Sequence, residues 1–188
     1  MYRIHVSLLA AGLVAALCGN AFAQTPKTEP KTEPKTTAAT AMKTALADTE
    51  FAQKAAMGGK KEVATAKMAA GKTKNADVKA LANKLVTDHT AANQELMSLM
   101  RTKHITPGAE PKAEPEPWRA KAGAAFDSGF VDHVIADHEK DIAAFEAEAN
   151  SGSDAELKEW ASKKLPTLRE HLKMAQDVKA KLPASTDR

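Results

Sequence analysis

The sequence predicts an all-α protein built as a four-helix bundle, and three observations favour this fold class. Aromatic residues make up only 4% of the 188 residues, whereas β-sheets are usually rich in aromatic and β-branched side chains. Apolar residues recur at three- and four-residue steps in four long stretches, which is the period of amphipathic helices. The single cysteine, Cys18, excludes both an intramolecular disulfide framework and a zinc site built on cysteines.

Residues 1–23 have the pattern of a cleavable secretory signal. Arg3 lies in a short basic start, an apolar run follows over residues 6–18, and Ala21-Phe22-Ala23 resembles a signal peptidase site. The apolar run is shorter than the roughly 20 residues that span a bilayer. We therefore expect cleavage after Ala23 and a periplasmic or secreted mature protein.

Two further features of this region bear on how the chain is anchored. A lipid anchor at Cys18 is the alternative to simple export, but the bulky Leu17 before the cysteine disfavours it. Residues 24–42 then carry a repeated Lys-Thr-Glu-Pro unit, which offers no apolar side chain to bury and is interrupted by proline. We expect these residues to form an extended, disordered linker.

The bundle domain is expected over residues 43–182, followed by a short tail at residues 183–188. Its four predicted helices cover about 43–70, 76–104, 126–149 and 153–182, with a short helical piece near Trp118. Each long helix carries an apolar stripe that would face the core. Ser153 and Glu156 have the spacing of a capping box at the start of the last helix.

The connection between the second and third helices decides the topology of the bundle. It contains Pro107, Pro111, Pro115 and Pro117. At about 3.3 Å per residue it is long enough to traverse the ~40 Å length of a helix. Its length is therefore compatible both with a crossover and with plain up-down winding.

Four ionisable residues lie on the stripes that should face the core, one on each helix. They are Glu62, His89, His138 and His171. Burying an uncompensated charge costs several kcal/mol, so such residues require partners. With a crossover, all four fall into a layer about one helical turn thick, whereas up-down winding separates Glu62 from His171 by ~10 Å.

Carboxylates and imidazoles that project inward from facing helices are the groups with which bundles build metal sites. A divalent transition metal, either iron, zinc or copper, is therefore one expectation for this cluster. Four aspartates are candidates for supporting groups or alternate ligands: Asp88, Asp127, Asp137 and Asp141. The alternative is a metal-free network in which each histidine pairs with a carboxylate. The Glu-x-x-His pairs of di-iron proteins are absent, which favours a mononuclear or weakly bound ion over a conventional di-iron oxidase.

Other common functional motifs are absent. His138-Glu139 lacks the second histidine of a zinc protease, and there is no glycine-rich phosphate loop or EF-hand loop. Basic and acidic residues alternate without an aromatic platform for bases, so no nucleic acid partner is expected. His133 lies off the apolar stripe and is expected to be solvated. After the signal, no segment is long and apolar enough to cross a membrane.

A set of short motifs resembles an exported bacterial family, the domain of unknown function numbered 4142. The motifs are Phe51-x-x-x-Ala55-x-x-Gly58, Glu62-Val63, Val78-Lys79-x-Leu81-Ala82, Asp88-His89, Phe126-Asp127, Asp137-His138-Glu139 and Leu165-Pro166-x-Leu168-x-x-His171-Leu172. The resemblance covers about residues 48–178 and implies a ferritin-like four-helix bundle with the Pro-rich crossover between helices two and three. Phe130 departs from the family, which often has tyrosine there, so a phenol that could hydrogen-bond the cluster is missing. The resemblance implies no activity.

We therefore expect an exported cell-envelope protein with a non-enzymatic binding or stress-related role. The sequence does not decide whether the protein is an enzyme. One alternative is a metal-dependent oxidase or metal-storage protein that uses the same cluster. Another is a structural module whose surface binds an envelope protein partner. The oligomeric state does not follow from the sequence.

Overall fold

The computed structural model describes residues 36–109 and 116–183. This part of the chain contains four long helices, one short 3-10 helix and no strand. They are α1 (Thr36–Lys72), α2 (Ala76–Thr102), η1 (Pro117–Ala120), α3 (Gly123–Ser151) and α4 (Ala155–Lys181). The all-α prediction is confirmed. The predicted signal, the linker before Thr36 and the tail after residue 183 lie outside the described residues.

The largest boundary difference is at the start of α1. Residues 36–42, expected to belong to the extended linker, are helical. Pro34 is the last proline of the repeat, and the alanine-rich stretch after it contains no residue that breaks a helix. The short helical piece expected near Trp118 is the 3-10 helix η1.

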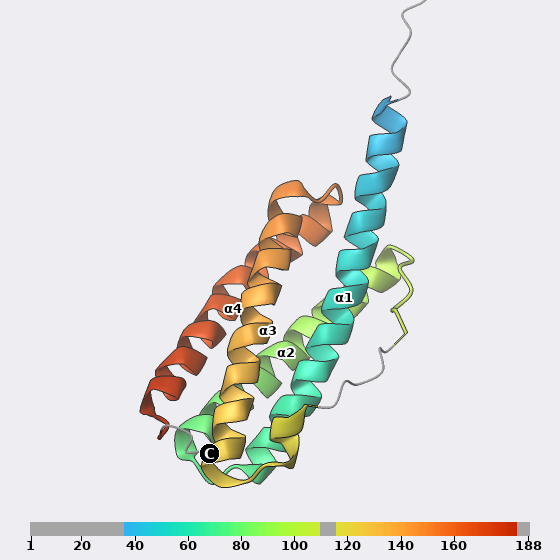
Figure 1. Ribbon diagram of the computed structural model, residues 1–188. Helices are drawn as coiled ribbons and strands as arrows, with labels where there is room; N and C mark the ends of the chain where they lie inside the picture. The colour runs from blue at the N-terminus through green and yellow to red at the C-terminus, as the bar shows by residue number, and fades with distance from the viewer. Residues whose placement is uncertain (1–35, 110–115, 184–188) are drawn as a thin grey trace, which may run out of the picture. The chain divides into compact units, whose positions relative to one another are not determined.

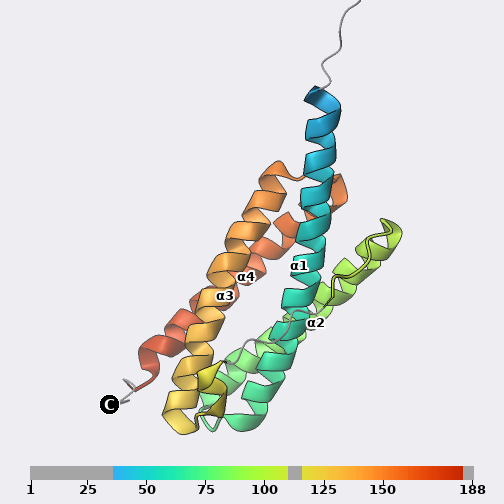
Figure 2. The ribbon, with the colours of Figure 1, turned by 45° about the vertical axis from the view of Figure 1, so that its right-hand side comes forward.

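The four helices have the crossover topology. By the order of their colours, α1 and α4 run in one direction and α2 and α3 run in the other (Figures 1 and 2). α1 packs on α2, α3 packs on α4, and the two pairs meet through α2 with α4 and α1 with α3. Every packed pair is thus antiparallel, and the connection from α2 must return along the bundle before α3 begins. This is the arrangement of ferritin-like bundles, and it excludes plain up-down winding.

Trp118 in η1 anchors the returning chain against α3. Its ring lies 5.6 Å from the ring of Phe126 and 6.0 Å from that of Phe130, between centroids. Gly129 makes this contact available, because a Cβ at that position would lie 2.3 Å from the Cβ of Trp118. The close approach fixes where α3 starts and therefore the height of every later residue on it.

The core consists of two apolar clusters with a polar layer between them. The first includes Ala66, Leu85, Val134 and Ala175. The second includes Ala56, Leu96, Phe145 and Leu168. On each helix a buried ionisable residue lies between members of the two clusters in sequence: Glu62, His89, His138 and His171. The apolar packing on both sides therefore sets the height of the polar layer. None of the described helices combines the length and hydropathy that a membrane span requires.

The turn from α3 to α4 is held by Asp48 of α1 and not by the predicted capping box. The buried Asp48 carboxylate accepts hydrogen bonds from the Ser153 backbone N–H at 3.0 Å, the Asp154 N–H at 2.8 Å and the Ser153 hydroxyl. Asp154 is the cap of α4 and accepts from the N–H groups of Glu156 and Leu157. The Ser153–Glu156 capping box is wrong because the serine hydroxyl donates across the bundle to Asp48.

Glu148, beside this turn, should make stability depend on pH. Its side chain is buried, and Oε1 has no hydrogen-bond partner among the described residues. Burial, together with the charges of Asp48 and Asp154, raises the pKa of Glu148 from 4.5 to about 7. Between these values the folded protein holds a proton that the unfolded chain has released, so stability falls as pH rises from about 4.5 to about 7. The full shift corresponds to about 3 kcal/mol, which solvent contact at the end of the bundle reduces to about 1–2 kcal/mol.

Glu148→Gln is expected to remove this part of the pH dependence. Urea unfolding at pH 8 should find the variant about 1–2 kcal/mol more stable than the wild type, and the two should agree near pH 4.5. The control is Glu146→Gln, which removes an exposed carboxylate of the same helix. If the two variants show the same pH profile, Glu148 is not the titrating group.

Candidate metal centre

The polar layer brings together the four side chains expected from the helix stripes. Glu62 bridges two histidines, since its Oε2 lies 3.0 Å from His89 Nδ1 and its Oε1 lies 3.4 Å from His138 Nδ1. His138 Nε2 faces His171 Nδ1 at 3.2 Å. The three imidazole centroids are 5.2–5.5 Å apart. One residue from each long helix thus contributes to a single contiguous cluster.

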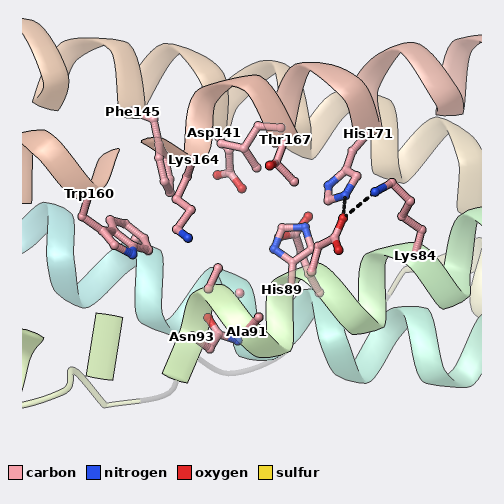
Figure 3. A pocket seen from close by; sticks show the side chains of 16 residues that line it. Lys84, His89, Ala91, Asn93, Asp141, Phe145, Trp160, Lys164, Thr167 and His171 are labelled. Carbon is pink, nitrogen blue, oxygen red and sulfur yellow. Dashed lines mark hydrogen bonds and ion pairs between the residues drawn. The ribbon is translucent and has the colours of Figure 1, made fainter. Parts of the chain in front are cut away.

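Oxygen acceptors fix the orientation of each imidazole. His138 Nδ1 lies 3.0 Å from the Val134 carbonyl oxygen, one turn earlier on α3. His171 Nε2 lies 2.8 Å from Asp88 Oδ2, and Lys84 Nζ donates to the same oxygen at 2.9 Å (Figure 3). A metal-binding histidine usually donates its second ring N–H to a carboxylate or carbonyl in this way.

These acceptors also assign the ring hydrogens. A carbonyl or carboxylate oxygen accepts only from a nitrogen that carries hydrogen, so His138 carries it on Nδ1 and His171 on Nε2. In the neutral rings, the two nitrogens that face each other at 3.2 Å are therefore both lone pairs. His89 Nδ1 lies against the Glu62 carboxyl group, and its buried Nε2 has no partner among the described residues.

Burial keeps all three imidazoles in the neutral, ligating form. The exposed fractions are 0% for His138, 1% for His171 and 7% for His89. Burial, reinforced by the neighbouring histidines, lowers the pKa of His89 to about 3 and that of His138 to about 4. Burial also lowers the pKa of His171, although its bond to Asp88 opposes the shift. The pKa of Glu62 is raised well above its ordinary value by burial and by the charges of Asp141 and Asp137.

The three histidines can reach a common metal ion. Each offers a nitrogen, and these nitrogens lie within 4.8 Å of one another. With metal–nitrogen bonds of about 2.0–2.1 Å in tetrahedral geometry, two nitrogens on one zinc ion are about 3.3 Å apart. The facing pair of His138 and His171, at 3.2 Å, already has this spacing. To complete the site, the His89 nitrogen must come to the same spacing from the other two.

The four predicted aspartates do not share one location. Asp88 contacts the cluster directly through His171. Asp137 meets His133 Nε2 at 3.3 Å, and Asp141 lines a cavity beside the cluster. Asp127 accepts from the Thr73 hydroxyl at 2.6 Å, at the turn between α1 and α2. Along the axis of α3, Asp127 lies about 16 Å from His138. It therefore holds the turn between α1 and α2 and is not part of the cluster.

Sequence reasoning missed several contributors to this region. The prediction that His133 is solvated is wrong, because its side chain is only 11% exposed and lies 3.1 Å from Glu116 Oε1, between that group and Asp137. Lys84 and the Val134 carbonyl orient the cluster. Lys84 lies four residues before Asp88, and Val134 lies four residues before His138. Residues at this spacing are neighbours on a helix, so the sequence contained a signal for both contacts.

A cavity of about 260 Å³ adjoins the histidine cluster on the side of α2 and α4. Its wall includes Glu62, His89, Asp141, Trp160, Lys164 and His171. Figure 3 shows the side chains of α3 and α4 on one side of the space and those of α2 on the other. The cluster is thus reached from a preformed space that can hold more than one water molecule.

Comparisons with known proteins agree on the family and the fold. The profile of a domain of unknown function, DUF4142, matches residues 32–178. The crystal structure of a DUF305 protein from Streptomyces coelicolor is similar with a TM-score of 0.62 and 11% identity, over 71% of this chain and 92% of that one. The crystal structure of a conserved hypothetical protein from Mycobacterium tuberculosis is similar with a TM-score of 0.63 and 12% identity. That match covers 77% of this chain and 99% of the other one. At these identities the two structures support the fold alone. No curated protein matches the chain.

Proposed function

The chain belongs to the DUF4142 family, as its motifs indicated, and we propose that it is an exported cell-envelope protein that binds one divalent transition metal ion. The ligands are His89, His138 and His171. Glu62 orients two of them and is placed to respond to the charge of the ion. The basis for export is the signal pattern at residues 1–23.

The observation that carries the proposal is the distance of 3.2 Å between His138 Nε2 and His171 Nδ1. Neither nitrogen carries hydrogen when His138 donates to Val134 and His171 donates to Asp88. Two bare nitrogens at this distance repel unless a cation lies between them. Either a proton or a metal ion can supply that charge, and only a metal ion can also bind the third imidazole. His89 offers that third nitrogen within 4.8 Å. Three neutral imidazoles suit zinc, copper and iron, whereas magnesium and calcium prefer oxygen ligands.

Metal analysis of the protein, exported from its own signal and purified from the periplasm, tests the proposal. After chelator treatment, titration with Zn²⁺, Cu²⁺ and Fe²⁺ should give one equivalent of bound ion for at least one metal. His138→Ala and His171→Ala should each weaken binding at least a hundredfold. Asp88→Asn, which leaves the ligands in place, should weaken it by about 10- to 100-fold.

The matched control is His104→Asn. His104 is exposed, lies outside the cluster and has a positive φ of 56°, which asparagine tolerates. This variant should bind metal like the wild type. Circular dichroism establishes that each variant is folded. If folded His138→Ala and His171→Ala bind as much metal as the control, the cluster is a polar network that fixes the core. An unprocessed protein that stays in the cytoplasm would contradict the export part of the proposal.

A further inference from the structure

The acidic side chains of α1 and α2 are kept away from the outer face of this helix pair. Each carboxylate of α2 pairs with a group on α4. The pairs are Asp77 with Lys181, Asp88 with His171 and Glu95 with Lys164. Between residues 51 and 72, α1 contains a single acidic residue, Glu62, which is buried. The side of the α1–α2 pair that faces away from α4 and the core therefore carries no carboxylate over these residues.

A groove of about 490 Å³ runs between α1 and α2 on this outer face. Lys60 and Lys67 line it from α1 and Arg101 lines it from α2, and all three are exposed. No ion pair to any of these three cations is found among the described residues. The other lining residues are uncharged: Val63, Thr90, Asn93, Gln94 and Met97. The groove thus holds positive charge that no neighbouring acid compensates.

Two exposed lysines extend this charge toward the turn between the helices. Lys74 lies in the turn, and Lys79 lies on α2 about three turns before Thr90, so it shares the face of that helix that lines the groove. Neither lysine has an ion pair within the part of the chain that the structure describes. From Lys79 to Arg101 the basic face extends over about 33 Å. A basic cluster of this size is typical of proteins that bind anionic lipid headgroups.

The start of α1 adds exposed apolar side chains to the same face. Met42 and Leu46 are 70% and 60% exposed. Lys60 follows Met42 by five helical turns and Lys67 follows Lys60 by about two, so the four side chains share one side of α1. The first turns of α1 extend beyond the other helices (Figures 1 and 2). A helix face that combines apolar side chains with lysines suits the interface of a membrane.

We propose that this face of α1 and α2 binds the surface of a membrane that contains anionic phospholipids. Lys60, Lys67 and Arg101 contact the phosphate groups, and Met42 and Leu46 enter the apolar edge of the bilayer. A small soluble anion cannot bridge cations spread over about 33 Å, and a soluble polyanion offers nothing apolar to Met42 and Leu46. The choice of a membrane rests on the proposed export to the cell envelope, whereas none of these side chains is a proposed metal ligand.

Co-sedimentation with vesicles tests the proposal on metal-free protein, exported from its own signal and purified from the periplasm. It should bind vesicles of phosphatidylglycerol mixed with phosphatidylcholine about tenfold or more tightly than vesicles of phosphatidylcholine alone. Raising the salt from about 0.1 M to about 1 M should release most of the protein, because the Debye length falls from about 10 Å to about 3 Å. Equal binding to both vesicles, or binding to neither, would overturn the proposal.

The double variant Lys60→Gln and Lys67→Gln should weaken vesicle binding about 25-fold, or about fivefold for each lysine. Its matched control is Lys163→Gln with Lys173→Gln, which removes the same charge from exposed positions of α4, where these lysines pair with Glu159 and Asp177. The control should bind vesicles nearly as well as the wild type.

Leu46→Ser should weaken vesicle binding severalfold and keep the preference for phosphatidylglycerol. Equal losses in the two double variants would show that binding follows net charge and not this face. Self-association that Leu46→Ser abolishes, without vesicle binding, would assign the start of α1 to a second copy of the chain instead. Metal titration of the Lys60→Gln and Lys67→Gln variant should match the wild type, so failure of the membrane proposal and failure of the metal proposal are separate results.

Discussion

Saturating metal is expected to raise the free energy of unfolding by about 4 kcal/mol, when the free ion is about a thousand times more concentrated than the dissociation constant. The ion binds the folded protein because the three imidazoles come from α2, α3 and α4, and the folded bundle brings their nitrogens within 4.8 Å of one another. In the unfolded chain these ligands are far apart, so binding favours the folded state almost exclusively.

Thermal unfolding measures this effect directly. For a chain of this size a gain of about 4 kcal/mol raises Tm by roughly 8–16 °C, and a chelator should reverse the rise. His138→Ala should lose the metal-dependent increment, because it removes the facing nitrogen at 3.2 Å from His171. His104→Asn should retain it. A metal-dependent rise of equal size in His138→Ala would show that the ion binds elsewhere on the chain.

The site could be anticipated from sequence because its signal is periodic. Each helix presents one ionisable residue on an otherwise apolar stripe, and the structure flanks each of these with buried apolar residues, such as Val134 and Phe145 around His138. Periodicity reports which face of a helix a residue occupies. It does not report which end of the bundle the residue reaches. For that reason the sequence pattern places Asp127 with the cluster, although on the helix it lies about 16 Å from His138.

The remaining errors have a different physical origin. His133 is covered by η1 and Glu116, which lie at the end of the Pro-rich connection, where no periodic pattern places the chain. Ser153 has the local sequence of a capping box, but a charged acceptor from α1 outcompetes the local partner. A hydrogen bond to a buried carboxylate is stronger than one between neutral groups. Local motifs are therefore least reliable where another element supplies a charge.

Asp48→Ala should be the most destabilising substitution at the turn from α3 to α4, with an expected loss of about 3 kcal/mol. The carboxylate accepts from two backbone N–H groups and one hydroxyl, and hydrogen bonds to charged groups contribute about 1.5–3 kcal/mol each before solvent replaces part of them. Asp48→Asn keeps the shape and one accepting oxygen, so it should lose about half as much. Glu50→Ala, on an exposed position two residues later, serves as the control and should change stability by less than about 0.5 kcal/mol.

A double-mutant cycle separates the two interpretations of Ser153. If the hydroxyl donates to Asp48, then Asp48→Ala and Ser153→Ala should show a coupling energy of about 1 kcal/mol in urea unfolding. If Ser153 instead forms a capping box, the coupling should appear between Ser153→Ala and Glu156→Ala. In the structure Glu156 pairs with Lys103 at 2.7 Å, so that second coupling should be near zero. Coupling to Glu156 with none to Asp48 would mean that the turn closes locally and that α1 does not hold the start of α4.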